Sequence, residues 1–174
     1  MDNPLLRTGL GILGALVYAA GGAYIGSLNA GWLDYGREAN PVLGVLGIGA
    51  SLVVAAFAGT AFSRRLREVG GAGRAAQILL VLGPALYVVS WLIDFAIFGT
   101  LTLAAGLFCL TIAAVMHKLA APVDRVLMGL SAIGSITWNT ETTSAFLLVG
   151  VGLIWVVLSV RLLSGSDRRL VAPG

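Results

Sequence analysis

The sequence predicts an all-α integral membrane protein: a polytopic bundle of six transmembrane helices, arranged as three hairpins with both termini in the cytoplasm. Of the 174 residues, 58% are hydrophobic and 11% are charged, whereas soluble domains carry about 25% charged residues. Six spans of about 20 residues each use most of the chain. We therefore expect one integral-membrane domain over residues 1–174, located in the cell membrane, with no separate soluble domain.

Apolar runs set the expected spans. The first run is too long for the core of a signal peptide, which predicts a retained helix. Pro41 stands at the start of the second run, where a missing N–H costs little, and Pro84 is expected to kink the third. The third and fourth runs form a tight hairpin around Asp94. The predicted spans are residues 8–29, 41–62, 75–93, 95–116, 123–138 and 144–160.

The fifth span is the shortest. Its apolar run from Val126 to Trp138 covers only about 20 Å as a helix, against a hydrocarbon core of about 30 Å. Residues 119–125 must enter the inner leaflet, or the outer end of the hairpin must lie below the membrane surface. A re-entrant segment is the alternative, and it would place the basic tail outside.

The positions of the cations predict the orientation. Only Arg37 falls on the side opposite the termini, whereas cytoplasmic loops of membrane proteins are rich in Lys and Arg. Residues 63–74 and 117–125 are predicted as basic loops on the cytoplasmic side. Three tryptophans fall at the opposite interface, where aromatic belts occur. The cations on the terminal side are Arg7, Arg64, Arg65, Arg67, Arg74, Lys118, Arg125, Arg161, Arg168 and Arg169.

Small residues recur at helical spacing in the first two runs. Membrane helices associate through close packing of small residues rather than through water exclusion. We interpret these residues as packing surfaces inside one bundle rather than as a dimer motif. The pairs are Gly22-xxx-Gly26 and Ala15-xxx-Ala19 in the first run, and Gly47-xxx-Ser51 and Ala55-xxx-Gly59 in the second.

Polar residues follow one face of three predicted helices. Spacings of three and four place side chains on the same helical face. Each stripe becomes more polar toward the outer end, which predicts that the three faces meet there. The stripes are Tyr18, Gly22 and Asn29; Gln77, Pro84, Tyr87, Trp91 and Asp94; and Met128, Ser131, Ser135 and Trp138.

Each outer hairpin tip carries a tryptophan followed within three residues by a carboxylate. We interpret the pattern as an outward-facing aromatic and carboxylate pocket, with ordinary belt aromatics beside loop acids as the alternative. Arg37 is the candidate ion-pair partner of Asp94 or Glu141; an uncompensated carboxyl there would instead bind a cation or exchange protons. The candidate ligand-binding residues are Tyr18, Asn29, Trp32, Asp34, Tyr87, Trp91, Asp94, Trp138, Asn139 and Glu141.

The sequence lacks the residues that several kinds of membrane-protein chemistry require. The single His117 cannot form a bis-histidine haem site, and Lys118 stands at a helix end rather than within a span as a retinal Schiff base requires. The single Cys109 excludes an intramolecular disulfide. No P-loop and no H-E-x-x-H motif occurs, and Gly129-Leu130-Ser131-Ala132 lacks a histidine partner at the required depth. We expect no cofactor, no metal and no nucleic-acid partner.

Three functions remain open. The first is a transport or substrate-capture subunit that handles a small or lipophilic ligand. The second is an intramembrane enzyme, an isoprenoid cyclase or isomerase, in which Asp94 and Glu141 act as acid and base beside aromatic rings that stabilise a carbocation. The third is an accessory structural subunit of a larger membrane complex. Beyond the lipid bilayer, partners are membrane subunits or further copies of the chain.

In topology and in the Ala15-xxx-Ala19 spacing the chain is similar to the substrate-capture subunits of vitamin-uptake (energy-coupling factor) transporters. The similarity includes no ligand-binding motif. It implies a cytoplasmic ATPase and a second membrane subunit as partners, with the basic segment from Arg64 to Arg74 as a candidate contact.

Overall fold

A computed structural model describes residues 3–33, 40–90, 96–138 and 142–164. Within these ranges every regular element is a helix, which confirms the predicted all-α class. The helices are α1 (Pro4–Asn29), α2 (Asn40–Phe57), α3 (Ala61–Glu68), α4 (Gly71–Val89), α5 (Ala96–Met116), α6 (Pro122–Thr137), the short 3-10 helix η1 (Thr143–Phe146) and α7 (Leu147–Leu163).

Four helical segments are long and apolar enough to cross a membrane: Pro4–Asn29, Gly71–Val89, Ile97–Met116 and Thr143–Leu163. A fifth candidate is α2 taken together with α3, although the chain bends by 86° between them. At 16 residues, α6 is shorter than the others. The described chain therefore holds four or five candidate membrane spans by length and composition.

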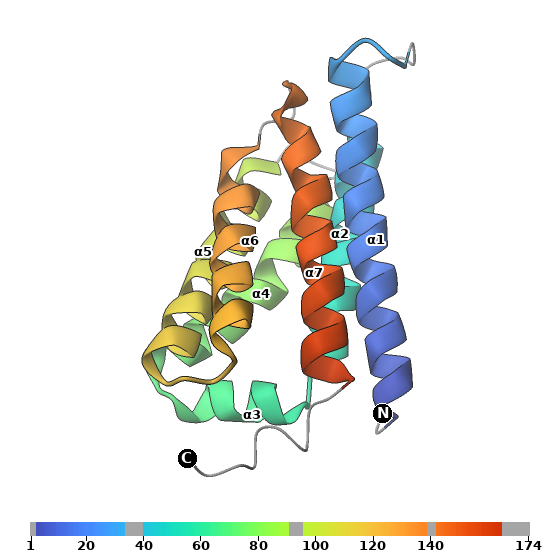
Figure 1. Ribbon diagram of the computed structural model, residues 1–174. Helices are drawn as coiled ribbons and strands as arrows, with labels where there is room; N and C mark the ends of the chain where they lie inside the picture. Colours follow the sequence, from blue (N-terminus) through green and yellow to red (C-terminus); the bar gives the residue numbers. More distant parts are fainter. Residues whose placement is uncertain (1–2, 34–39, 91–95, 139–141, 165–174) are drawn as a thin grey trace.

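Six helices form a closed ring. Along the ring, α1 contacts α2, α2 contacts α4, α4 contacts α5, α5 contacts α6, α6 contacts α7, and α7 returns to α1. Figure 1 shows these helices running up and down in turn, with the start of α1 and the end of α7 at the same end of the bundle. Helix α3 lies across that end, which we call the basic end.

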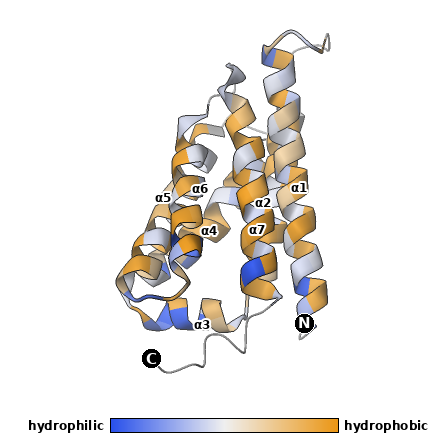
Figure 2. Cartoon of the chain, in the orientation of Figure 1, coloured by the Kyte–Doolittle hydropathy of each residue, from blue (hydrophilic) through white to orange (hydrophobic). Residues whose placement is uncertain are grey.

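The outward faces of the ring are apolar. Large exposed side chains occur along every ring helix, among them Leu16 in α1, Ile48 in α2 and Ile78 in α4. Helix α6 follows the same pattern, with an exposed stripe at spacings of three and four. That stripe consists of Val123, Val126, Leu130, Ile133 and Ile136. Figure 2 shows hydrophobic residues along the helices of the bundle and strongly hydrophilic residues in and near α3.

The predicted span 41–62 and the predicted basic loop 63–74 are wrong at their common boundary. Helix α2 ends at Phe57, because Gly59 adopts a φ of +72°, a conformation that favours glycine. Thr60 then caps a new helix, since its hydroxyl accepts a hydrogen bond of 3.1 Å from the Ser63 N–H. Half of the expected loop is thus helix α3, and Gly71 already begins α4.

Helix α3 is amphipathic and attached to the bundle. Phe62 and Leu66, one turn apart, are buried, whereas Arg64 and Arg67 are exposed. The Gln77 side-chain amide in α4 donates to the Ser63 carbonyl at 2.7 Å and lies 3.1 Å from the Ser63 hydroxyl. Such a helix suits the boundary between hydrocarbon and water.

Pro122 opens α6 one residue before the predicted span 123–138, so the last four residues of the predicted basic loop 117–125 are helical. Asp124 therefore lies in the first helical turn, where a carboxylate is stabilised by the helix dipole. It is buried and accepts a hydrogen bond from the Arg161 guanidinium in the last turn of α7. This ion pair joins α6 to α7 at the basic end.

Close backbone contacts join α1 to both neighbours. A Cβ on Gly14 would lie 2.6 Å from the Gly49 carbonyl oxygen in α2, and a Cβ on Gly152 in α7 would lie 2.6 Å from the Ala19 Cβ. Gly22 and Gly26 likewise face side chains of η1 and α7. Of the predicted small-residue pairs, both pairs of the first run and Gly47 of the second thus pack inside one bundle as expected. Ser51, Ala55 and Gly59 of the second run are exposed and do not form such a packing surface.

These contacts make a first prediction. A Cβ on Gly49 would stand 2.7 Å from the Tyr18 backbone nitrogen, so Gly49→Ala should destabilise the protein by about 1–3 kcal/mol through overpacking. The measurement is thermal unfolding of the purified protein in detergent. Gly150→Ala is the control, because nothing lies within 4 Å of its Cβ position. Equal melting temperatures for the two variants would contradict the close α1–α2 contact.

Candidate functional site

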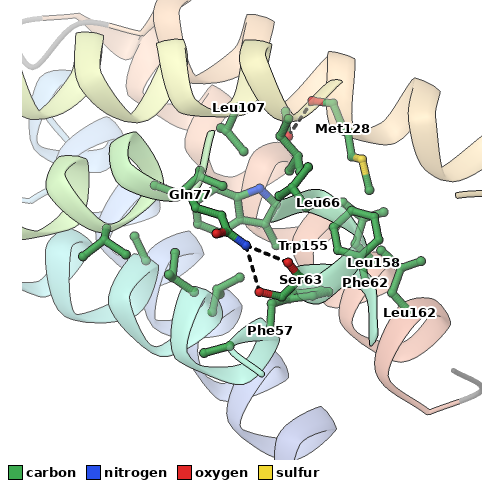
Figure 3. A pocket seen from close by; sticks show the side chains of 18 of the residues that line it. Phe57, Phe62, Ser63, Leu66, Gln77, Leu107, Met128, Trp155, Leu158 and Leu162 are labelled. Carbon is green, nitrogen blue, oxygen red and sulfur yellow. Dashed lines mark hydrogen bonds between the residues drawn. The ribbon is translucent and has the colours of Figure 1, made fainter. Parts of the chain in front are cut away.

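The interior of the ring holds a cavity of about 390 Å³ in its basic half. Small-molecule sites usually enclose about 300–1,000 Å³, so the space suffices for a small ligand. Figure 3 shows side chains from α2, α3, α4, α5, α6 and α7 turned toward it. Helix α3 forms the floor, and Trp155 lies at mid-height of the bundle.

The lining is almost entirely apolar. Phe57, Phe62, Leu66, Leu107 and Leu158 contribute to its wall. The polar members among the described residues are Ser63, Arg67, Gln77 and Ser131. The Ser131 hydroxyl donates to the Met128 carbonyl at 2.8 Å, and the Gln77 amide donates to Ser63, so both groups help to hold the wall together.

The lining residues Ala58, Gly59 and Arg67 are exposed, so the cavity reaches the surface at the basic end, where α2 gives way to α3, and we call this opening the mouth. Arg67, on the exposed side of α3, contributes to the lining there. Gly59 also lines the cavity, and the Arg7 guanidinium would lie 3.7 Å from a Cβ added to it. An apolar chamber thus opens beside two guanidinium groups.

A second set of polar side chains fills the ring above the cavity. The Tyr87 hydroxyl in α4 and the Thr100 hydroxyl in α5 are 2.8 Å apart and share a hydrogen bond. Tyr87 also stacks at 6.4 Å on Trp138, which follows α6. The Tyr18 hydroxyl approaches Ser135 and Tyr87 from α1. We call these five residues the hydroxyl cluster.

Three polar atoms of the hydroxyl cluster find no hydrogen-bond partner among the described residues. They are the Tyr18 hydroxyl, the Ser135 hydroxyl and the Trp138 indole nitrogen, and all three are buried. A buried polar atom without a partner costs about 1–3 kcal/mol. The Tyr18 ring also stacks on Trp155, with ring centroids 4.6 Å apart. Trp155 also lines the cavity, so this pair of rings joins the cavity wall to the hydroxyl cluster.

Of the ten candidate site residues, the structure brings three together. Tyr18, Tyr87 and Trp138 are buried in the hydroxyl cluster. Asn29 and Trp32 lie on the surface: the Asn29 amide donates to the Thr142 carbonyl at 2.9 Å, and Trp32 stacks on Phe146 at 5.5 Å. Asp34, Trp91, Asp94, Asn139 and Glu141 fall outside the described residues, so the carboxylate pocket stays a prediction.

The helical stripes do point inward. Gln77, Met128 and Ser131 line the cavity, while Pro84 and Ser135 are buried. The sequence reasoning missed Ser63, Arg67 and Trp155 as lining residues. The spacing of Phe62, Leu66 and Val69 was the available signal for α3, because it marks an apolar helical face within the arginine-rich segment.

No known protein family matches the chain, and neither does any curated protein or solved structure. The structure places Ala15 and Ala19 against Gly152 of α7, within the chain's own bundle. The function is therefore argued from the cavity and its surroundings.

The hydroxyl cluster yields a second prediction. Tyr87→Phe removes a hydrogen bond between α4 and α5 and should lower the free energy of unfolding by about 0.6 kcal/mol, as is typical inside membrane proteins. Tyr18→Phe removes a buried hydroxyl without a described partner, so it should leave stability unchanged or raise it. Thermal unfolding of both variants is the measurement. A loss for Tyr18→Phe as large as for Tyr87→Phe would show that its hydroxyl is satisfied.

Proposed function

We propose that the chain is a six-span protein of the cell membrane, with both termini in the cytoplasm, that binds a lipophilic small molecule in the cavity of its basic half. The observation that carries the proposal is the apolar chamber of about 390 Å³, closed on its floor by α3. Proteins pack their interiors densely and leave few voids larger than a water molecule. A space of this size inside a small bundle favours a ligand site over a purely structural role.

The exposed stripe of α6 supports six crossings. Its outward side chains are as apolar as those of the neighbouring helices, and α6 completes the ring between α5 and α7. A helix with such a face is stable against lipid and would be costly against water. The described cations, from Arg7 to Arg161, lie in α3 or near the ends of helices at the basic end, which supports a cytoplasmic placement of that end.

The chemistry of the lining supports binding rather than catalysis. Among the described lining residues there is no carboxylate, histidine or cysteine that would serve as acid, base or nucleophile. Gln77 and Ser131 are engaged in hydrogen bonds within the wall. A role in substrate capture or transport of a lipophile fits this lining best, because such a role needs affinity and no reacting group.

The six-span topology is tested with fusions to alkaline phosphatase, which is active only outside the cytoplasm. A fusion after Thr142 should be active, because α6 will have carried the chain across. Fusions after Lys118 and after Gly174 should be inactive. An inactive fusion after Thr142 would mean that α6 is re-entrant or peripheral and does not cross the bilayer, which would contradict the six-span topology.

Ligand binding is tested by quenching of tryptophan fluorescence in nanodiscs. Trp155 lines the cavity, so 9,10-dibromostearyl alcohol should quench it saturably, and the quench should be missing from Trp155→Phe. Ala50 also lines the cavity, so Ala50→Leu should fill part of the space and weaken binding about tenfold or more.

The matched control is Ala55→Leu, which adds the same side chain to the exposed side of α2. It should bind the alcohol like the parent protein. Equal binding by Ala50→Leu and Ala55→Leu, with both variants folded, would contradict a ligand site in this cavity.

A further inference from the structure

We infer that the cavity takes a single-chain amphiphile with an anionic head, its hydrocarbon chain in the chamber and its acidic group beside Arg67. This inference rests on the proposed function, because it names the ligand class of the same cavity. Three features of the site carry it: the apolar depth, the size, and the charge at the mouth.

The depth of the chamber selects a hydrocarbon chain. Beyond the mouth the wall consists of side chains such as Leu103, Leu107 and Leu158, together with Trp155. A polar group moved into this space would lose its hydrogen bonds to water without replacement. The polar lining groups Gln77 and Ser63 are already bonded to each other near the floor. The ligand part that fills the chamber is therefore apolar.

The size of the chamber selects one chain. Its volume of about 390 Å³ lies in the lower part of the range for small-molecule sites. The ring helices touch through glycine backbones at several places, such as Gly14 against Gly49 and Gly83 against Leu103. Since these contacts leave little room between helices, the chamber cannot easily widen for a second chain.

The charge at the mouth selects an acidic head. Arg67 lines the cavity, and the Arg7 guanidinium stands beside the lining residue Gly59. The carboxylates of the described residues are Glu68 and Asp124, neither of which lines the cavity, and Asp124 is bonded to Arg161. Arg67 therefore presents a guanidinium group at the mouth, and guanidinium groups bind carboxylates and phosphates through paired hydrogen bonds.

The orientation of α3 places Arg67 where the acidic head of the ligand lies when its hydrocarbon chain fills the chamber. The helix lies across the end of the bundle, with Phe62 and Leu66 turned into the protein and Arg67 on the exposed side. A guanidinium on such an interfacial helix stands at the depth of lipid headgroups while its hydrocarbon stem follows the apolar surface. An amphiphile that enters from the inner leaflet would therefore keep its acidic head at the membrane depth that it already occupies in that leaflet.

The experiment compares two probes that share one chain. 9,10-Dibromostearic acid and 9,10-dibromostearyl alcohol are titrated at alkaline pH into the full chain in phosphatidylcholine nanodiscs, and quenching of Trp155 is recorded. The acid should bind about three- to tenfold more tightly than the alcohol, as one exposed or partly desolvated charge contact provides. Arg67→Gln should abolish this preference, so that the acid and the alcohol bind with equal affinity, and Arg67→Lys should keep part of it.

Arg64→Gln is the matched control, because it removes the same charge from the same helix at a position outside the lining. It should keep the preference for the acid. Equal affinities for acid and alcohol in the parent protein, or a preference that survives Arg67→Gln, would overturn the anionic head while leaving the lipophile site intact. Absence of saturable quenching by either probe would overturn both proposals.

A third probe separates the sources of the acidic head. Tighter binding of brominated lysophosphatidic acid than of the brominated fatty acid would assign a lysophospholipid, and the reverse order would assign a free fatty acid. Either order supports the single-chain anionic class.

Discussion

The interior of this protein depends on how closely α1 approaches its two neighbours, α2 and α7. Apolar side chains gain nothing by leaving lipid for a protein core, so the helices must attract one another through dense contact. Glycines supply that contact: Gly14 against Gly49 on one side, and Gly152 against Ala19 on the other. Because small residues occupy these contacts, larger side chains are left to project outward to lipid or inward to the centre of the ring. The cavity and the hydroxyl cluster are both consequences of this division.

The helices of the fold were predictable because long apolar runs between charged segments have few alternatives. The start of α5 and the short α6 were each predicted to within one residue. Helix α3 was not predicted, because the arginines between Phe62 and Val69 outweigh a short apolar face in any count of composition. The sequence predicts that this span ends at Phe62, because the apolar run continues to that residue. The backbone turns earlier, at Gly59. Composition defines where a membrane helix is possible, and a single glycine conformation decides where it ends.

The inward direction of the site was also predictable, whereas its depth was not. The phase of Gln77 and Tyr87 on one helix, and of Ser131 and Ser135 on another, places these side chains inside the ring, where they are found. The location of empty space is a different matter, because it depends on how side chains from six helices fill a common volume. Trp155 shows the difficulty: it belongs to no polar stripe, and its role arises from the Tyr18 ring beside it in space. The cavity lies at the basic end, for which the sequence predicts only a set of loops.

The stacked rings of Tyr18 and Trp155 have a consequence for the traffic of any guest. Trp155 lines the chamber and stacks on Tyr18, so any widening of the chamber on that side requires two packed rings to move together. Dense packing makes such a movement slow compared with exchange through the exposed lining residues beside α3. The dwell time of a guest that leaves beside α3 is then set by how fast it moves past that helix.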